Sequence, residues 1–140
     1  MTDNQLTGEQ MRLVEAAFAS VPFIHFLGLE LGAVERGAVT LHLDVRDELR
    51  QVRGLLHGGV TASLIDTAAA FAIITTLSEG ESTATVDLTI HYMRPLLSGR
   101  LTAQARVLRA GRRLLTVTVD IQDEAGNLAA TALTTYAKLA

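Results

Sequence analysis

The chain has 140 residues, a formal net charge of −3 and an apolar content of 49%. This length suits a single domain over residues 1–140 and leaves little room for a second. The acidic balance provides no overall basic surface for nucleic acid, and the absence of cysteine excludes disulfides, thiolate metal sites and a cysteine nucleophile.

The first 21 residues are expected to form an N-terminal segment built on one helix. Thr7 and Gln10 are spaced as in a capping box, and the apolar stripe that follows predicts a helix over 8–20. Pro22 is expected to end it. Because the opening MTDNQLTGEQ is polar and acidic, it is no secretory signal, and the cytoplasm is the expected compartment.

Two strands and a long helix are predicted next. Residues 29–33 and 39–45 alternate apolar with more polar side chains around a turn at 35–37, which is typical of a hairpin. After a charged connection over 46–56, a helix is expected over 58–77. Ser63, Asp66 and four threonines argue against a membrane span in this helix, so we expect it to be buried within the protein.

The C-terminal half predicts four further strands, over 84–92, 101–107, 115–121 and 128–138. Arg109 to Arg112 is expected to form a turn between the second and third of them. On the first strand, alternation places Val86 and Leu88 on one face and Thr85 on the other. The central helix is hydrophobic nearly all round, so the predicted fold is α+β, with a curved antiparallel sheet wrapped around that helix.

Asp66 is the only formally charged residue between Arg53 and Glu79. A carboxylate in so apolar a segment is costly unless it is paired, neutralised or solvated in a cleft. It lies nine residues after His57, which opens a His-Gly-Gly turn at a helix start, where free N–H groups can polarise a carbonyl. Asp66 lies about 12 Å beyond Gly58 along the helix axis, so a partner subunit would have to bring the two groups together.

The surroundings of Asp66 on the helix are expected to be small. Its neighbours one turn away are Ala62, Ser63, Ala69 and Ala70. This face would admit a flat group beside the carboxylate. The bulky side chains are expected elsewhere on the helix, namely Leu64, Phe71 and Ile74.

The segments LLHGGVTASLIDTAAAFA, TVDLTIHYMRP and RAGRR resemble the hotdog-fold acyl-CoA thioesterases of the phenylacetate-degradation (PaaI-like) type. The resemblance covers residues 22–138. It implies that Asp66 is the nucleophile or general base and that the Gly58 N–H polarises the thioester carbonyl. It also implies that His57 shapes the turn, that Gln51 lies near the thioester and that Thr85 helps to position water.

The resemblance further implies a substrate and an assembly. The substrate would be an acyl-CoA, and coenzyme A would enter only as part of it, with no metal or other cofactor. The alanine-rich face beside Asp66 suggests that the acyl group is aryl or medium-chain. Arg109, Arg112 and Arg113 would meet the coenzyme A phosphates. The acid and the turn would come from different subunits of a homodimer, which often pairs again into a homotetramer.

Three alternatives stay open at this point. A hotdog hydratase or dehydratase is disfavoured because the chain has no His-Phe-Pro-Gly loop. A non-catalytic acyl-CoA binding module would usually carry an output domain, for which the chain has no room. Asp66 would also fit a structural acid paired with an arginine across a dimer interface.

Overall fold

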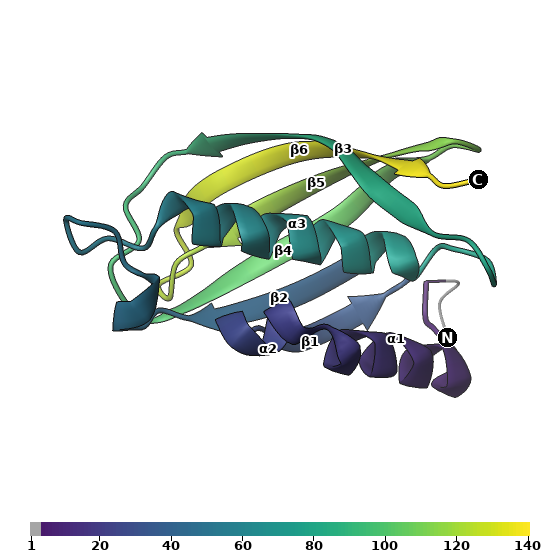
Figure 1. Ribbon diagram of the computed structural model, residues 1–140, viewed down its shortest axis with the longest axis horizontal. Coiled ribbons are helices and arrows are strands. Elements are labelled where there is room, and N and C mark those ends of the chain that lie inside the picture. Colours follow the sequence, from purple (N-terminus) through teal and green to yellow (C-terminus); the bar gives the residue numbers. More distant parts are fainter. Residues whose placement is uncertain (1–3) are drawn as a thin grey trace.

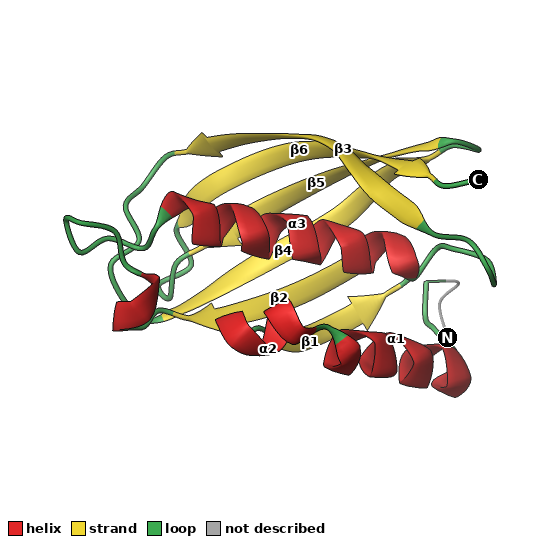
Figure 2. Cartoon of the chain, in the orientation of Figure 1, coloured by secondary structure: helices red, strands yellow, loops and turns green. Residues whose placement is uncertain are grey.

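The computed structural model describes residues 4–140, which form a curved antiparallel sheet around one long helix (Figures 1 and 2). The strand order is β1-β2-β4-β5-β6-β3. The strands are β1 (Glu30–Glu35), β2 (Ala38–Asp44), β3 (Thr83–Tyr92), β4 (Arg100–Ala110), β5 (Leu114–Gln122) and β6 (Leu128–Lys138). The predicted α+β architecture is therefore confirmed. Strand β4 continues to Ala110, so the following turn comes later than the sequence predicted.

Two helices precede the sheet. Helix α1 (Gly8–Ser20) begins with the predicted capping box between Thr7 and Gln10. Pro22 does more than follow this helix, because it is the first residue of a second helix, α2 (Pro22–Leu27), which the sequence reading missed. Proline suits that position because the first helical N–H has no partner within the helix. Residues 1–3 of the expected N-terminal segment lie outside the described part of the chain.

The central helix α3 (Gly58–Ile74) ends three residues earlier than predicted. The Thr75 and Thr76 hydroxyls donate to the Ala72 and Ile73 carbonyl oxygens, each at 2.7 Å. Threonine hydroxyls that bond the preceding turn favour the end of a helix. The connection before α3 contains a short 3-10 helix, η1 (Asp47–Leu49), which was also not predicted.

The core lies between α3 and the concave face of the sheet, where α3 contacts β2, β4 and β5 (Figure 1). It is built from aliphatic side chains that are fully buried. Those at 0% exposure include Leu41, Leu43, Leu64, Ile65, Ile73, Leu101, Leu115 and Ile121. Helix α3 is thus fixed against the sheet along one side, and its other side borders β3, α1 and α2.

Strand β3 is an edge strand with an irregularity that changes which side chains face α3. Thr85 pairs with Tyr136 of β6, but Asp87 pairs with the adjacent Thr135, so Val86 is an extra residue. A bulge of this kind shifts the alternation by one residue. Thr85 and Leu88 therefore lie on the same, helix-facing side, and the prediction that they lie on opposite faces is wrong.

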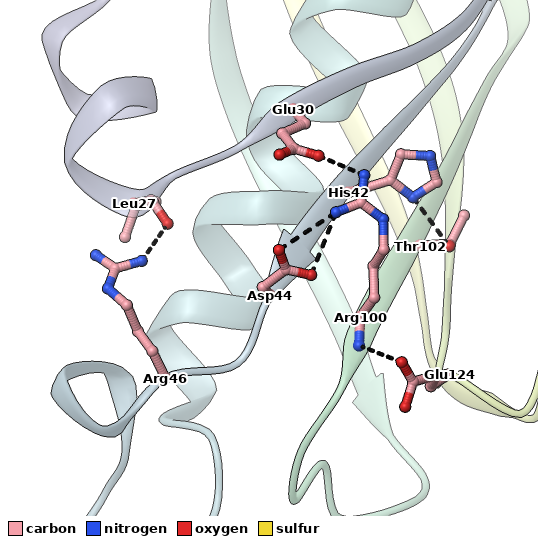
Figure 3. Close-up of polar contacts among 8 residues, drawn as sticks. All are labelled: Leu27, Glu30, His42, Asp44, Arg46, Arg100, Thr102 and Glu124. Carbon is pink, nitrogen blue, oxygen red and sulfur yellow. Dashed lines mark hydrogen bonds and ion pairs between the residues drawn. The ribbon is translucent and has the colours of Figure 1, made fainter.

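Charged side chains join β4 to β1 and β2 near the other edge of the sheet, the one that β1 forms (Figure 3). Arg100 of β4 donates to Glu30 of β1 and, at 3.2 Å, to Oδ1 of Asp44 in β2. The nearby Arg46 donates to the Leu27 carbonyl oxygen at 2.7 Å and so binds the end of α2 to the loop after β2. The contact of Arg46 fixes the end of α2, and this helix forms part of the wall of the cavity described next.

Candidate active site

Asp66 opens on a cavity of about 420 Å³ between α3, the two N-terminal helices and strands β3 and β6. The carboxylate is half-buried there, and the other polar lining residues are Ser20, Thr67, Thr83, Thr85 and Tyr136. The apolar lining residues are Ala17, Val21, Ile24, Ala70, Phe71, Ile74 and Ala84. A cavity with apolar side chains along the helices and a carboxylate in its wall suits a ligand that has an apolar part and one reactive group.

Two hydroxyl groups bind one oxygen of the Asp66 carboxylate. Thr85 donates to Oδ1 at 3.0 Å, and the Tyr136 hydroxyl lies 2.5 Å from the same atom. Within residues 4–140, Oδ2 accepts no hydrogen bond and the carboxylate has no arginine or lysine partner. Asp66 therefore has one oxygen, Oδ1, that accepts hydrogen bonds from described residues and one, Oδ2, that accepts none from them.

The structure corrects the expected surroundings of Asp66. Phe71 and Ile74 line the same cavity, although the sequence reading placed them away from the acid. Of the small residues expected beside it, Ala70 lines the cavity and Ala69 is buried in the core. The error arose because i±3 and i±4 neighbours were considered alone, whereas the cavity follows the helix for about two turns beyond Asp66.

The His-Gly-Gly turn forms the start of α3, and His57 caps it. Nδ1 of His57 accepts the Gly59 N–H at 2.8 Å, so the histidine anchors the turn as an N-cap residue. The Gly58 N–H has no acceptor among the described residues. Gly58 lines a second cavity, of about 290 Å³. Its N–H, at the positive end of the helix dipole, is therefore next to a cavity that a ligand could enter.

Gln51 lines this second cavity together with Gly58 and Tyr92. Its side-chain oxygen accepts the backbone N–H of Arg53, which leaves the amide nitrogen as the group that can donate to a ligand. The Tyr92 hydroxyl donates to the Gly58 carbonyl oxygen at 2.7 Å and holds the turn against the end of β3. The structure thus places Gln51 and Gly58 in the lining of one cavity, and His57 lies next to Gly58 as the N-cap of α3.

The acid and the turn remain apart in one chain. No residue is shared between the lining of the Asp66 cavity and that of the Gly58 cavity. The predicted arginines lie in neither cavity lining: Arg109 is the penultimate residue of β4, and Arg112 and Arg113 occupy the exposed turn before β5. This turn lies beside the end of β6, where the Lys138 N–H donates to the Arg113 carbonyl oxygen at 2.8 Å.

Sequence reasoning missed the chain's two tyrosines, which both place their hydroxyl groups on α3. Tyr92 reaches Gly58, and Tyr136 reaches Asp66 from 70 residues away. The signal that could have found Tyr136 is its position on a strand that alternates, with the buried Thr134 two residues before it. Burial and the bond to Asp66 raise the pKa of Tyr136 far above its usual range.

The chain belongs to the thioesterase superfamily, whose family model matches residues 53–130. It is a thioester hydrolase with the hotdog fold, as the resemblance in its sequence predicts. In the described part of the chain, no helix is long and apolar enough to cross a membrane.

Individual relatives agree with this assignment. The chain is 33% identical over 148 residues to the medium/long-chain acyl-CoA thioesterase YigI of Salmonella typhimurium, covering 94% of this chain and 96% of the relative. The thioesterase HI1161 of Haemophilus influenzae superimposes with a TM-score of 0.86 at 26% identity, over 99% and 95% of the two chains. The PaaI protein of Escherichia coli has a TM-score of 0.88 at 22% identity over 97% of each chain, which shows the fold.

Proposed function

We propose that the protein hydrolyses an acyl-CoA thioester with an aryl or medium-chain acyl group to the free acid and coenzyme A. The observation that carries this proposal is the Asp66 carboxylate, which lines the cavity and has one oxygen that accepts no hydrogen bond from residues 4–140. The similarity to YigI, named a medium/long-chain acyl-CoA thioesterase, supports the choice of coenzyme A ester.

In the proposed reaction, Asp66 acts in one of two ways. As a nucleophile, Oδ2 attacks the thioester carbonyl carbon, the C–S bond breaks, and the coenzyme A thiolate leaves and takes up a proton. Water then hydrolyses the resulting anhydride and regenerates the carboxylate. As a general base, Asp66 instead removes a proton from a water molecule whose oxygen attacks the same carbon. The C–S bond then breaks, the coenzyme A thiolate leaves and takes up the proton, and the Asp66 carboxylate is regenerated.

The Gly58 N–H is the proposed donor to the oxygen of the thioester carbonyl. It has no acceptor within residues 4–140, which supports this role, because a preformed donor stabilises the negative charge that develops during attack. Gly58 precedes Asp66 by eight residues on one helix, which is about 12 Å along the axis. The proposal therefore takes Gly58 from one subunit and Asp66 from its partner, with Gln51 beside Gly58 and Thr85 beside Asp66.

The proposed assembly is a homodimer, or a dimer of dimers, joined through the β3 edge. Strand β3 pairs on one side only, with β6, within the described residues. Its surface carries exposed apolar side chains, including Val86 at 59% and Tyr92 at 55% exposure. A long edge strand with apolar side chains favours pairing with a second chain. Such pairing would place the α3 helices of two subunits side by side.

Coenzyme A is proposed to bind with its phosphates near Arg109, Arg112 and Arg113. The guanidinium groups suit phosphate oxygens, and the two turn residues are exposed. The cytoplasmic compartment stays a prediction of the sequence.

The test is the release of free thiol from a panel of phenylacetyl, benzoyl and straight-chain saturated acyl-CoA esters of increasing length. Asp66→Asn keeps the size of the side chain and removes its charge, so it should lose turnover by about 10²-fold or more while remaining folded. If the wild-type protein releases no thiol, or if Asp66→Asn is fully active, the proposal is wrong. Tight binding without turnover would then favour a binding module, and loss of enoyl-CoA absorbance would favour a hydratase.

A further inference from the structure

We propose that Tyr136 is a positioning residue for the reaction: its hydroxyl holds Oδ1 of Asp66, so that Oδ2 is the oxygen presented to the substrate. This inference rests on the proposed function, since it assigns a role in thioester hydrolysis to a residue of the same site. Tyr136 lies on β6 and contacts Asp66, and both residues line the same cavity as the apolar side chains of α1, α2 and α3.

The contacts of Tyr136 suit this role. Its hydroxyl lies 2.7 Å from the backbone oxygen of Asp66 and 2.5 Å from Oδ1, so it contacts both the helix backbone and the carboxylate of the same residue. The hydroxyl has one proton to share between these two acceptors, and its short contact with Oδ1 restricts rotation of the Asp66 carboxylate about its last torsion. Thr85 binds the same oxygen at 3.0 Å, and no described residue competes for Oδ2.

Tyr136 is better fixed than Thr85. Its side chain is 3% exposed, and β6 is paired on both sides, with β5 and with β3. Thr85 lies on the edge strand next to the bulge and is exposed. A rigid second contact preserves the geometry of a reactive group, and a displacement of about 1 Å can cost about 10²-fold in rate.

The hydroxyl of Tyr136 stays protonated while the enzyme works. Burial, and next the hydrogen bond to Asp66, raise its pKa far above the usual range for tyrosine. It therefore donates and never competes with Asp66 as a base. Its function is to orient the carboxylate, whereas the reacting atom belongs to Asp66.

Steady-state thiol release by Tyr136→Phe tests the proposal, with Thr134→Val as a matched control. Phenylalanine keeps the ring and removes only the hydroxyl. Thr134 lies on the same face of β6, and its buried hydroxyl donates to the Asp87 carbonyl oxygen, away from Asp66. We expect Tyr136→Phe to lower kcat by about tenfold or more with KM changed by less than about twofold. Thr134→Val should lower Tm and leave kcat unchanged.

A double variant separates positioning from general damage. If Tyr136 acts only through Asp66, adding Tyr136→Phe to Asp66→Asn should cause no further loss. A kcat for Tyr136→Phe equal to wild type, or the same fractional loss in both backgrounds, overturns the inference while leaving the proposed function intact. Inactive wild-type protein would instead refute the proposed function.

A measurement without turnover tests the contact itself. The carboxyl resonance of Asp66, in protein labelled with carbon-13 aspartate, is identified by its absence in Asp66→Asn. We expect it to shift in Tyr136→Phe and to stay in place in Thr134→Val. A resonance that does not move in Tyr136→Phe shows that the hydroxyl does not hold the carboxylate, whatever the activity of the enzyme.

Discussion

Two inactive variants should restore activity when they are combined in one dimer. The first is Asp66→Asn, which removes the reacting carboxylate. The second is Gly58→Pro, which removes the proposed oxyanion donor and little else. Proline is tolerated at the first position of a helix, and His57 before it has φ −61° and ψ 131°, the extended conformation that a residue before proline requires.

The expected magnitude follows from the geometry of α3. Reacting groups must approach to about 3–3.5 Å, whereas Gly58 and Asp66 of one helix are separated by about 12 Å along its axis. Each site of a dimer would therefore combine Gly58 of one subunit with Asp66 of the other. A mixed dimer then has one intact site and one that is doubly impaired, and should show about half of the wild-type turnover per dimer.

The assay uses two affinity tags, one on each variant, to purify the mixed dimer after co-expression. Each parent alone should be reduced by about 10²-fold or more. Gly58→Ala is the matched control, because it keeps the N–H and its Cβ would meet the Tyr92 hydroxyl oxygen at 3.5 Å and the ring carbons at 3.6 Å, which are ordinary contacts. A mixed dimer no more active than its parents would refute the shared site, and an active Gly58→Pro parent would refute the role of the N–H.

Two further predictions concern the core and the substrate. Leu41→Ala, at a position with 0% exposure, should lower the free energy of unfolding by about 2–5 kcal/mol, measured by chemical denaturation; a loss below about 1 kcal/mol would contradict the packing described. Replacing Arg112 and Arg113 together by alanine should raise KM for the coenzyme A ester, leave kcat nearly unchanged and weaken the dependence of kcat/KM on salt. An unchanged salt dependence would place the coenzyme A phosphates elsewhere.

Much of the fold was predictable because local patterns and tertiary structure agree. The capping box at Thr7 and the apolar stripe after it gave the bounds of α1, and the predicted bounds of β6 also agree with the structure. Helix α2 was missed because Pro22 was read as the end of a helix, although proline equally well begins one. Nothing in the local pattern marked Val86 as an extra residue, since it is itself apolar and β-branched.

The candidate site was predictable to a similar extent. A lone acid in an apolar helix and a glycine turn are local features, so Asp66 and Gly58 could be found in the sequence. The contact between Tyr136 and Asp66 joins residues 70 positions apart in the sequence. It depends on how β6 is placed against α3 in the folded protein. Such a contact has no local signature, and a pattern of period two identifies only the face on which the tyrosine lies.

The placement of the two tyrosines gives the protein a spectroscopic property. The chain has no tryptophan, so its near-ultraviolet absorbance and emission arise mainly from Tyr92 and Tyr136. The hydroxyl of one binds the start of α3 and that of the other binds the acid on the same helix. The intrinsic optical signal of this chain therefore originates at the two halves of its candidate site, and occupancy there can be followed without any attached label.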